Sequence, residues 1–535
     1  MVGASRDMAV VRIPLKSAKH HFGVSLSRGS RPYNEDSYQA GTIEVPAFAK
    51  RRPVSLQRGA GGSLKSEVTP ADTASGDPQV FYFGVFDGHR GAECAGWLRE
   101  ELHLYLEQTT KLFELESSLQ AQNDRDRRRP SSMSDPEERP VVGQTAAADG
   151  KESLDAIETH TPPGTEPLRP PEPGTDGELP TPGAESKSAP MESAPSVEQS
   201  HSIMKAEELE RTLVKNWKEL VGGYFRRFKP DYFSLSAGGK GHLAEKEIAS
   251  KRISTDASIS TDATEGIGIE SVLEYAFLKA DYDFVSAQVA KRDEDPVLSD
   301  RAINDDDILG QPSRPGNNIG GPNRFKGGST CSIALISTPT PSPFWHPASP
   351  SSLITAHVGD TRILLCDTAT GQAIPLTSNH HPSLPEEATR LRRYAATFVT
   401  DSFGEERVSG LANTRAFGDM AHKRIGVSAE PEIRRVELSP AEYSFMVLVS
   451  DGVSGHLHDQ EIVDIVKEAK TPEQAARDVT AFATEVADDA DNATTLVVRL
   501  GGWERRSEGG LGSLGTKEMR DWRRDEADDP RRSIR

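Results

Sequence analysis

The chain has 535 residues, of which 35% are hydrophobic and 6% aromatic, and its formal net charge is −19. Because this negative charge opposes contacts with phosphate groups, it argues against binding to nucleic acid or to an anionic membrane surface. The sequence contains no apolar run of about 18 residues or more, so no transmembrane segment is expected.

The three cysteines, Cys94, Cys331 and Cys366, lie in or beside apolar segments and lack the spacing of a metal site. We therefore interpret them as small residues of the apolar core, in a protein of a reducing compartment. Residues 1–19 form a basic arm whose single acid is Asp7. This arm is compatible with a short organelle presequence and also with an ordinary basic arm, so an intracellular protein of either mitochondrial or cytoplasmic location is expected.

Short apolar runs bounded by turns predict strands, and apolar residues recurring every three or four positions predict helices. In the first half, strands are predicted at 21–27, 41–45 and 80–86, and helices at 91–113, 207–228 and 269–290. In the second half, strands are predicted at 330–337, 353–358, 362–366, 444–449 and 494–500, and helices at 385–394, 459–469 and 472–487. This order of strands, helices and strands favours an α+β fold in which helices cover antiparallel sheets.

Polar stretches without apolar periodicity interrupt this pattern. They cannot bury enough apolar surface to offset the entropy of ordering, so we predict that they are disordered. One domain is therefore predicted over 20–501, followed by a loose charged tail at 502–535. The predicted insertions into this domain lie at about 50–79, 121–204, 235–265 and 293–326.

The buried strand at 80–86 ends in Asp87, Gly88 and His89. An isolated Asp-Gly pair is more often a turn than a site, but other acids have similar settings next to predicted strands: Glu35, Asp36, Asp451 and Asp491. Carboxylates from separate strands can meet at one edge of a sheet, and Mg²⁺ and Mn²⁺ prefer several oxygen ligands. The sequence therefore indicates a site for a hard divalent cation. The lack of a paired His/Cys ligand pattern argues against zinc.

Seven short motifs extend this picture. They are RPYNED (31–36), VFDGHRG (85–91), GSTCS (328–332), AHVGDTR (356–362), LANTRAFGD (411–419), SDG (450–452) and DNAT (491–494). In this order they resemble the motifs of the metal-dependent protein serine/threonine phosphatases of type 2C, the PPM family. The resemblance implies a β-sandwich of two antiparallel sheets flanked by helices, with a dinuclear Mn²⁺ or Mg²⁺ centre at one end.

The resemblance also implies ligands for two cations per subunit and for a third, weaker site. These ligands are Glu35, Asp87, Gly88, Asp360, Asp451 and Asp491. Asp87 would bridge the two cations. The Gly88 carbonyl oxygen and Glu35, the latter directly or through a water, would bind one of them. Asp451 and Asp491 would complete the ligands of the other cation, and Asp360 would belong to the weaker site.

Two further residues have implied roles in the reaction. Arg31 would bind the substrate phosphate, because its forked donors suit two oxygens, and His89 would protonate the leaving seryl or threonyl oxygen. The implied activity is hydrolysis of phosphoserine and phosphothreonine in proteins by a metal-activated water. The protein is expected to be a monomer that acts on phosphoprotein substrates and binds no nucleic acid.

Two alternatives stay open. One is a catalytically silent scaffold of the same fold that binds partners through its insertions, and the other is a metal phosphatase that acts on small phosphoesters. The chain departs from the family pattern at Arg90, where the family commonly has glycine, and we expect this arginine to face solvent. Asp419 is expected to bind loop backbone rather than a cation.

Overall fold

The computed structural model describes residues 21–50, 77–119, 203–242, 267–291, 319–392, 398–400, 406–408, 410–506 and 511–529. All of these residues lie in one compact unit, composed of Met1–Asp124 and Pro190–Arg535. The predicted basic arm and most of the predicted insertions lie outside the described residues. None of the helices in the described ranges has the length and apolar character needed to cross a membrane.

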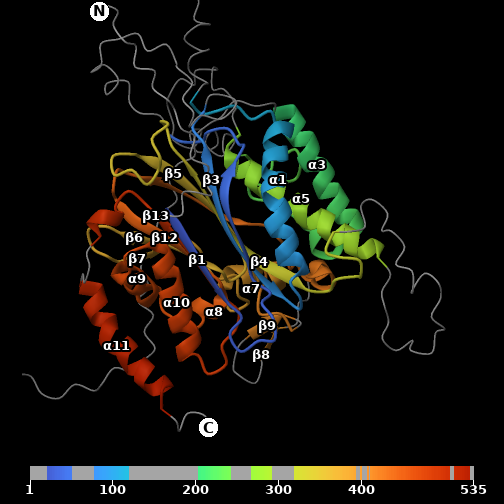
Figure 1. Cartoon of the computed structure of the whole chain (residues 1–535). Coiled ribbons are helices and arrows are strands. Elements are labelled where there is room, and N and C mark those ends of the chain that lie inside the picture. Colours follow the sequence, from blue (N-terminus) through green and yellow to red (C-terminus); the bar gives the residue numbers. More distant parts are fainter. Residues whose placement is uncertain are drawn as a thin grey trace, which may run out of the picture. The chain divides into compact units, whose positions relative to one another are not determined.

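Two antiparallel sheets form the centre of this unit (Figure 1). The first has the strand order β1 (Phe22–Ser27), β13 (Ala493–Arg499), β12 (Tyr443–Val449), β6 (Arg362–Asp367) and β7 (Ala373–Pro375). The second has the order β11 (Glu432–Leu438), β5 (Ser351–Val358), β4 (Gly328–Ser337), β3 (Val80–His89) and β2 (Ser37–Ile43), with β10 (Phe417–Gly418) also paired to β4. A separate antiparallel pair is formed by β8 (Phe398–Thr400) and β9 (Glu406–Val408).

The two sheets pack face to face through apolar side chains from both of them. On β3, Phe81, Phe83 and Val85 point into this shared layer, where they meet Met446 and Leu448 of β12. The alternate β3 residues, such as Tyr82 and Phe86, point the other way into the core beneath the helices. Because successive side chains of a strand point to opposite faces, a strand that is covered on both faces has a continuous apolar run. The predicted sandwich is therefore confirmed.

Helices cover the outer face of each sheet (Figure 1). On the second sheet these helices are α1 (Glu93–Leu112) and α5 (Ile269–Ala290), and α3 (Ile203–Leu220) packs against α5. On the first sheet they are α9 (Asp459–Glu468) and α10 (Pro472–Val486), which pack on each other and are contacted by α11 (Leu511–Ala527). Shorter helices are α7 (Pro385–Arg392), α8 (Asp451–Ser454), and the 3-10 turns η3 (Gly223–Arg227), η4 (Met420–Ile425) and η5 (Trp503–Arg505).

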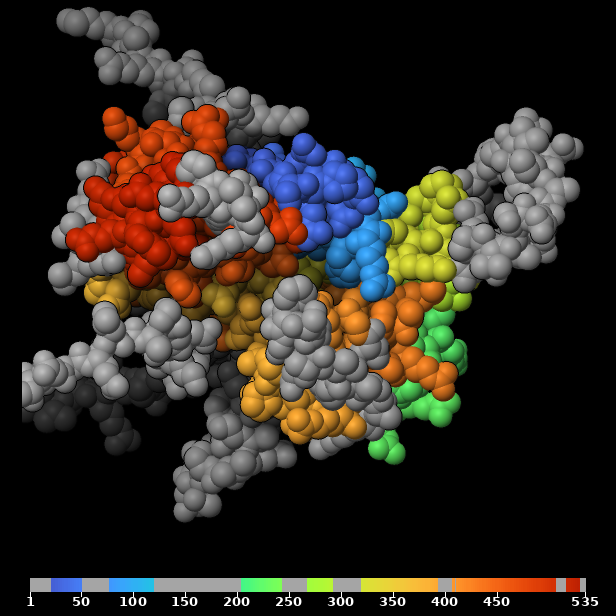
Figure 2. All heavy atoms as spheres, turned by 90° about the horizontal axis from the view of Figure 1, so that it is seen from below, coloured from blue at the N-terminus to red at the C-terminus, as the bar shows by residue number. Residues whose placement is uncertain are grey.

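The two ends of the domain sequence meet in the first sheet. β1 pairs with β13, from Phe22 opposite Val498 to Ser27 opposite Ala493, and α10 packs against both strands. The space-filling view accordingly has blue N-terminal residues beside orange and red C-terminal ones (Figure 2). This closure carries the sequence around residue 31 to the same region as the sequence around residue 491.

Several predicted elements differ from the structure. The helix predicted over 207–228 ends at Leu220, because Gly222 and Gly223 both have positive φ, at 68° and 52°, and a 3-10 turn follows. The strand predicted at 41–45 occupies 37–43 instead, in register with β3. The strand β11 was not predicted from its charged sequence, EIRRVEL.

The tail predicted to be loose contains the helix α11. Polar contacts attach this helix: Arg520 donates to Glu468 at 2.7 Å, and Arg523 donates to Glu461 at 3.1 Å and to the His456 carbonyl at 2.7 Å. Because the interface is formed by charged side chains, the sequence has no apolar stripe that would have predicted it.

Candidate active site

The strand β3 carries the central acid of the site. We predicted that the strand would stop at Phe86, but it continues through His89, with Asp87 opposite Thr330 of β4. The correction follows from the length of β4, which supplies pairing partners up to its first residue, Gly328. The chain turns only at the next two residues, Arg90 and Gly91, whose φ angles are 62° and 125°.

The glycine after Asp87 is required by a close contact. A Cβ atom on Gly88 would lie 2.6 Å from the backbone oxygen of Glu35, which is too close for any other residue. The Glu35 side chain turns back to the same loop, where its Oε1 accepts a hydrogen bond from the Gly91 N–H at 2.7 Å. Glu35 and Gly88 are therefore neighbours, and the close backbone approach is the reason for the glycine.

Three of the predicted acids come together. Asp87 lies near the end of β3, Asp360 lies in the turn between β5 and β6, and Asp451 opens α8 shortly after β12. Each of these acids has a carboxylate oxygen within 4.8 Å of the others. The backbone N–H of Asp451 also donates to Asp87 Oδ2 at 3.3 Å. Acids from both sheets thus meet at one end of the sandwich.

The electrostatics of this cluster favour a cation. Burial raises the pKa of Asp87 well above its ordinary value, and the charge of Asp451 raises it further. Burial likewise raises the pKa of Asp451, with Asp360 as the next cause. Carboxylates that are buried together and repel one another are stabilised when a positive charge binds between them. The donor set, which is composed of oxygens, therefore fits Mg²⁺ or Mn²⁺.

Asp36 is a fourth acid, which was named among the candidate acids of the sequence but was given no ligand role. It is buried next to Asp87, and its Oδ2 accepts hydrogen bonds from Ser450 Oγ at 2.8 Å and Thr494 Oγ1 at 2.7 Å. Burial raises the pKa of Asp36 to about 6 in spite of these hydrogen bonds. Its place directly after Glu35 was the available signal, but the motif alone does not say which of two adjacent acids points inward.

Arg31 and Asp491 form a pair at the edge of the cluster. Nε and Nη2 of Arg31 donate to the two carboxylate oxygens of Asp491 at 2.9 and 2.7 Å. Both side chains are partly exposed, at 50% and 39%. The negative charge of Asp491 contributes to the raised pKa of Asp451, so it acts on the cluster although its own oxygens face the arginine.

His89 has an acidic partner. Its Nε2 lies 2.8 Å from Asp419 Oδ2, and Asp419 is fully buried. Burial alone would lower the pKa of His89, but the hydrogen bond and charge of Asp419 outweigh it, and the pKa is raised. Asp419 is predicted to bind loop backbone rather than a cation. The structure corrects the first part of this prediction, because the side chain of Asp419 contacts His89 instead.

A buried ion pair fixes the segment that precedes Asp419. Lys423 Nζ lies 2.6 Å from Asp281 Oδ2, and both side chains are fully buried. The other oxygen of Asp281 accepts the Gly418 N–H at 2.9 Å, and Lys423 also donates to the Ala416 carbonyl at 2.8 Å. The helix α5 thus fixes the backbone that precedes Asp419.

Arg90, which departs from the family pattern, is exposed as expected. Its φ of 62° is in the left-handed region, where residues other than glycine are strained. The three cysteines are buried and unpaired, in agreement with their predicted role as core residues.

Parts of the chain are similar in sequence to known protein phosphatases. Residues 251–494 match the family model described as protein phosphatase 2C. Protein phosphatase 2C homolog 4 of Schizosaccharomyces pombe is 44% identical over 182 residues, which are 34% of this chain and 47% of that protein. The mitochondrial protein phosphatase 1K of Xenopus laevis is 39% identical over 152 residues, which are 28% of this chain and 40% of that protein.

The chain therefore spans less than half the length of these two relatives. Among solved structures, the serine-threonine phosphatase 2C from Toxoplasma gondii superposes over 90% of this chain and 94% of its own, with 14% identity and a TM-score of 0.39. These sequence matches show that residues 251–494 of this chain are similar to the protein phosphatase 2C family.

Proposed function

We propose that this protein is a metal-dependent protein serine/threonine phosphatase. The observation that carries the proposal is the convergence of Asp87, Asp360 and Asp451 within 4.8 Å, in a chain whose residues 251–494 match the protein phosphatase 2C family model. A silent scaffold has no need for such a cluster, because raised carboxylate pKa values reflect burial and repulsion that destabilise the fold unless a cation binds. The retained acids therefore weigh against the scaffold alternative.

The proposed centre holds two Mn²⁺ or Mg²⁺ ions and a third, weaker one. Its proposed ligands are those that the resemblance implies: Glu35, Asp87, the Gly88 carbonyl, Asp360, Asp451 and Asp491. When bound, the cations supply a water that is activated for attack on phosphorus near neutral pH. Asp36 lies next to these ligands. We propose that it does not bind a cation directly and is held by hydrogen bonds from two hydroxyl groups.

The side chains of the protein would bind the phosphate and deliver the proton. Arg31 has a planar fork of donors that matches two phosphate oxygens. In the structure this fork is bound to Asp491, so substrate phosphate and the cation at Asp491 would together replace this ion pair. His89, whose pKa is raised next to Asp419, is protonated more readily and can give its proton to the leaving oxygen.

The proposal is tested by phosphate release from a phosphothreonine peptide, using the full chain with Mn²⁺. We expect Asp87→Asn to abolish the Mn²⁺-dependent rate, whereas Asp478→Asn, which changes an exposed acid on α10, should leave it unchanged. A small aryl phosphate measured in parallel separates the protein phosphatase from the small-phosphoester alternative. An unchanged rate in Asp87→Asn would refute the assignment.

We propose that the substrates are phosphoproteins, that the protein is a monomer, and that it is intracellular. The mitochondrial relative and the basic arm at 1–19 together support a mitochondrial location over a cytoplasmic one. A fluorescent reporter fused to residues 1–30 tests this, and diffuse cytoplasmic fluorescence would contradict it.

A further inference from the structure

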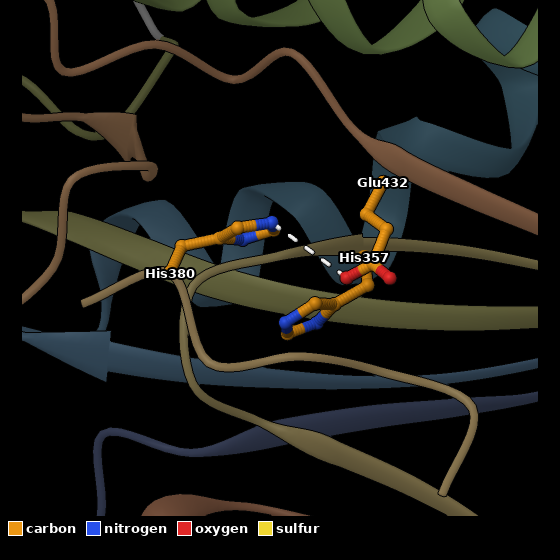
Figure 3. Close-up of side chains that lie close together, drawn as sticks. All are labelled: His357, His380 and Glu432. Atoms are coloured by element: carbon orange, nitrogen blue, oxygen red, sulfur yellow. Dashed lines mark ion pairs between the residues drawn. The ribbon is translucent and has the colours of Figure 1, made fainter. Parts of the chain in front are cut away.

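Three side chains near the acid cluster form a second group (Figure 3). His357 lies on β5, His380 follows β7, and Glu432 opens β11, and each has one ligand-type atom within 4.8 Å of the others. Figure 3 shows the His380 ring directed toward Glu432, with 3.8 Å between Nε2 and Oε2. Proximity alone would indicate a second metal site.

The hydrogen bonds of the two histidines argue against a metal ion. Nε2 of His357 lies 3.0 Å from the carbonyl oxygens of both Gly359 and Ser378, so it carries a proton and donates. Nδ1 of His357 lies 2.9 Å from Ser332 Oγ, so neither nitrogen is available. The group therefore offers at most two ligands, from His380 and Glu432, whereas a structural zinc site needs four.

The two histidines instead hold the peptide groups of Gly359. Its N–H donates to His380 Nδ1 at 3.0 Å, and its carbonyl oxygen accepts from the His380 backbone N–H at 2.8 Å and from His357 Nε2 at 3.0 Å. The rings stack with centroids 4.8 Å apart and planes at 17°. Gly359 has a φ of 105°, and a Cβ there would lie 2.3 Å from Thr330. The residue before Asp360 is thus fixed on all sides.

Asn413 holds the carboxylate of Asp360 itself. Its Nδ2 donates to Asp360 Oδ2 at 2.9 Å, while Asp360 Oδ1 is buried without a hydrogen-bond partner among the described residues. The neighbouring Thr414 is attached to His380, because its backbone N–H donates to the His380 carbonyl at 2.8 Å. Thr414 Oγ1 also lies 2.6 Å from Glu387 Oε2 on α7, which anchors this segment.

These contacts close a ring that runs from Asp360 through Gly359, His380, Thr414 and Asn413 back to Asp360. We propose that this ring positions the Asp360 carboxylate so that its unpaired oxygen faces a divalent cation. Its positioning residues are His357, His380 and Asn413. The inference rests on the proposed function, since it assigns the support of one acid in the proposed metal centre.

The test measures Mn²⁺ binding by calorimetry on the full chain, without substrate. Asn413→Leu removes the amide donor at similar volume, and we expect the weaker Mn²⁺ binding event to lose about tenfold in affinity, because hydrogen bonds to charged groups are among the stronger ones. The tighter event should change by less than about twofold, which serves as an internal control for correct folding. The manganese paramagnetic resonance spectrum provides a second readout.

The histidines allow tests by matched substitution. His380→Asn keeps an acceptor near the position of Nδ1, and His357→Gln keeps a donor near that of Nε2, so both should bind Mn²⁺ like the wild type. His380→Leu and His357→Leu should weaken the same event by roughly three- to tenfold, as expected for lost neutral hydrogen bonds. The control His381→Ala changes a neighbouring histidine that contacts Ser383, and it should have no effect.

The outcomes separate the two proposals. A wild-type protein that binds no Mn²⁺ would overturn the proposed function and this inference with it. Wild-type binding combined with unaltered isotherms in Asn413→Leu and His380→Leu would overturn the inference alone. Tight binding of Zn²⁺ that is lost in His357→Gln and in His380→Asn would also overturn it, because the histidines would then be ligands.

Discussion

Replacing Lys423 by methionine should strongly destabilise the domain. Methionine has a similar length but no charge, so Asp281 would be left buried without its cation and the Ala416 carbonyl without a donor. Two unit charges 2.6 Å apart attract by about 6 kcal/mol at an effective dielectric constant of 20. Since removal of one partner from a buried pair typically costs 3–5 kcal/mol, we expect a loss of about 4 kcal/mol in the free energy of unfolding.

The loss should depend on pH. Burial raises the pKa of Asp281 to about 6 even with the lysine present. An acid whose pKa is higher in the folded chain binds its proton more tightly when folded, so its contribution to stability falls as pH rises through the folded pKa. Without Lys423 the folded pKa rises further, and the variant should therefore be less destabilised at pH 5 than at pH 8.

Urea unfolding followed by circular dichroism measures both effects. The double variant Asp281→Asn with Lys423→Met removes both charges but keeps an acceptor for the Gly418 N–H, so it should recover most of the stability lost in the single variant. A loss below about 1 kcal/mol in Lys423→Met, or a double variant that is less stable than the single one, would refute the reasoning.

Three other predictions concern Arg90, Glu387 and Asp419. Arg90→Gly should raise the free energy of unfolding by about 1 kcal/mol in urea unfolding, because glycine adopts a φ of 62° without strain, and a loss of stability would contradict this. Glu387 lies between two arginines that lower its pKa despite burial, so it should stabilise the fold above about pH 4.5 and lose this contribution in more acidic solution. The acid unfolding of Glu387→Gln should lack this component. An acid transition identical to that of the wild type would argue against the prediction. Asp419→Ala should lower kcat on the order of 10- to 100-fold with little change in KM, since it releases His89; a change confined to KM would speak against a role in proton transfer.

Much of the fold was predictable because the central elements are apolar on a regular period. The helix predicted at 269–290 matches α5 at both ends, and the α1 residues Ala95, Leu98 and Leu102, which recur at three- and four-residue steps, are buried. Such segments are placed by the burial of their own side chains. The sequence pattern is then sufficient.

The elements that the sequence did not predict, β11 and α11, are held by ion pairs and hydrogen bonds of charged side chains. β11 joins the edge of the second sheet with a sequence rich in charge, and its Arg435 is buried against Glu270 at 3.0 Å. The helix α11 docks through Arg520 and Arg523. Because these partners are distant in sequence, no local pattern indicates that their charges are satisfied.

The candidate site was predictable to a similar degree. Strand-end motifs indicated Asp87 and Asp451, and the resemblance added Asp360; the structure brings these three acids together. The contacts of Asp36 and Asp419 depend on how adjacent residues point, and this is fixed only when β2 pairs with β3 and when the Asp281–Lys423 pair holds the loop. The ligand roles themselves stay predictions.

The most direct test of the account is the rate of phosphate release from a phosphoserine peptide as Mn²⁺ is titrated into wild-type protein and Asp87→Asn. We predict a rate that rises and saturates with Mn²⁺ for the wild type, and a rate at least about 10³-fold lower for Asp87→Asn at every concentration. A wild-type rate that does not depend on added or removed divalent cation, or a variant as active as the wild type, would contradict the account.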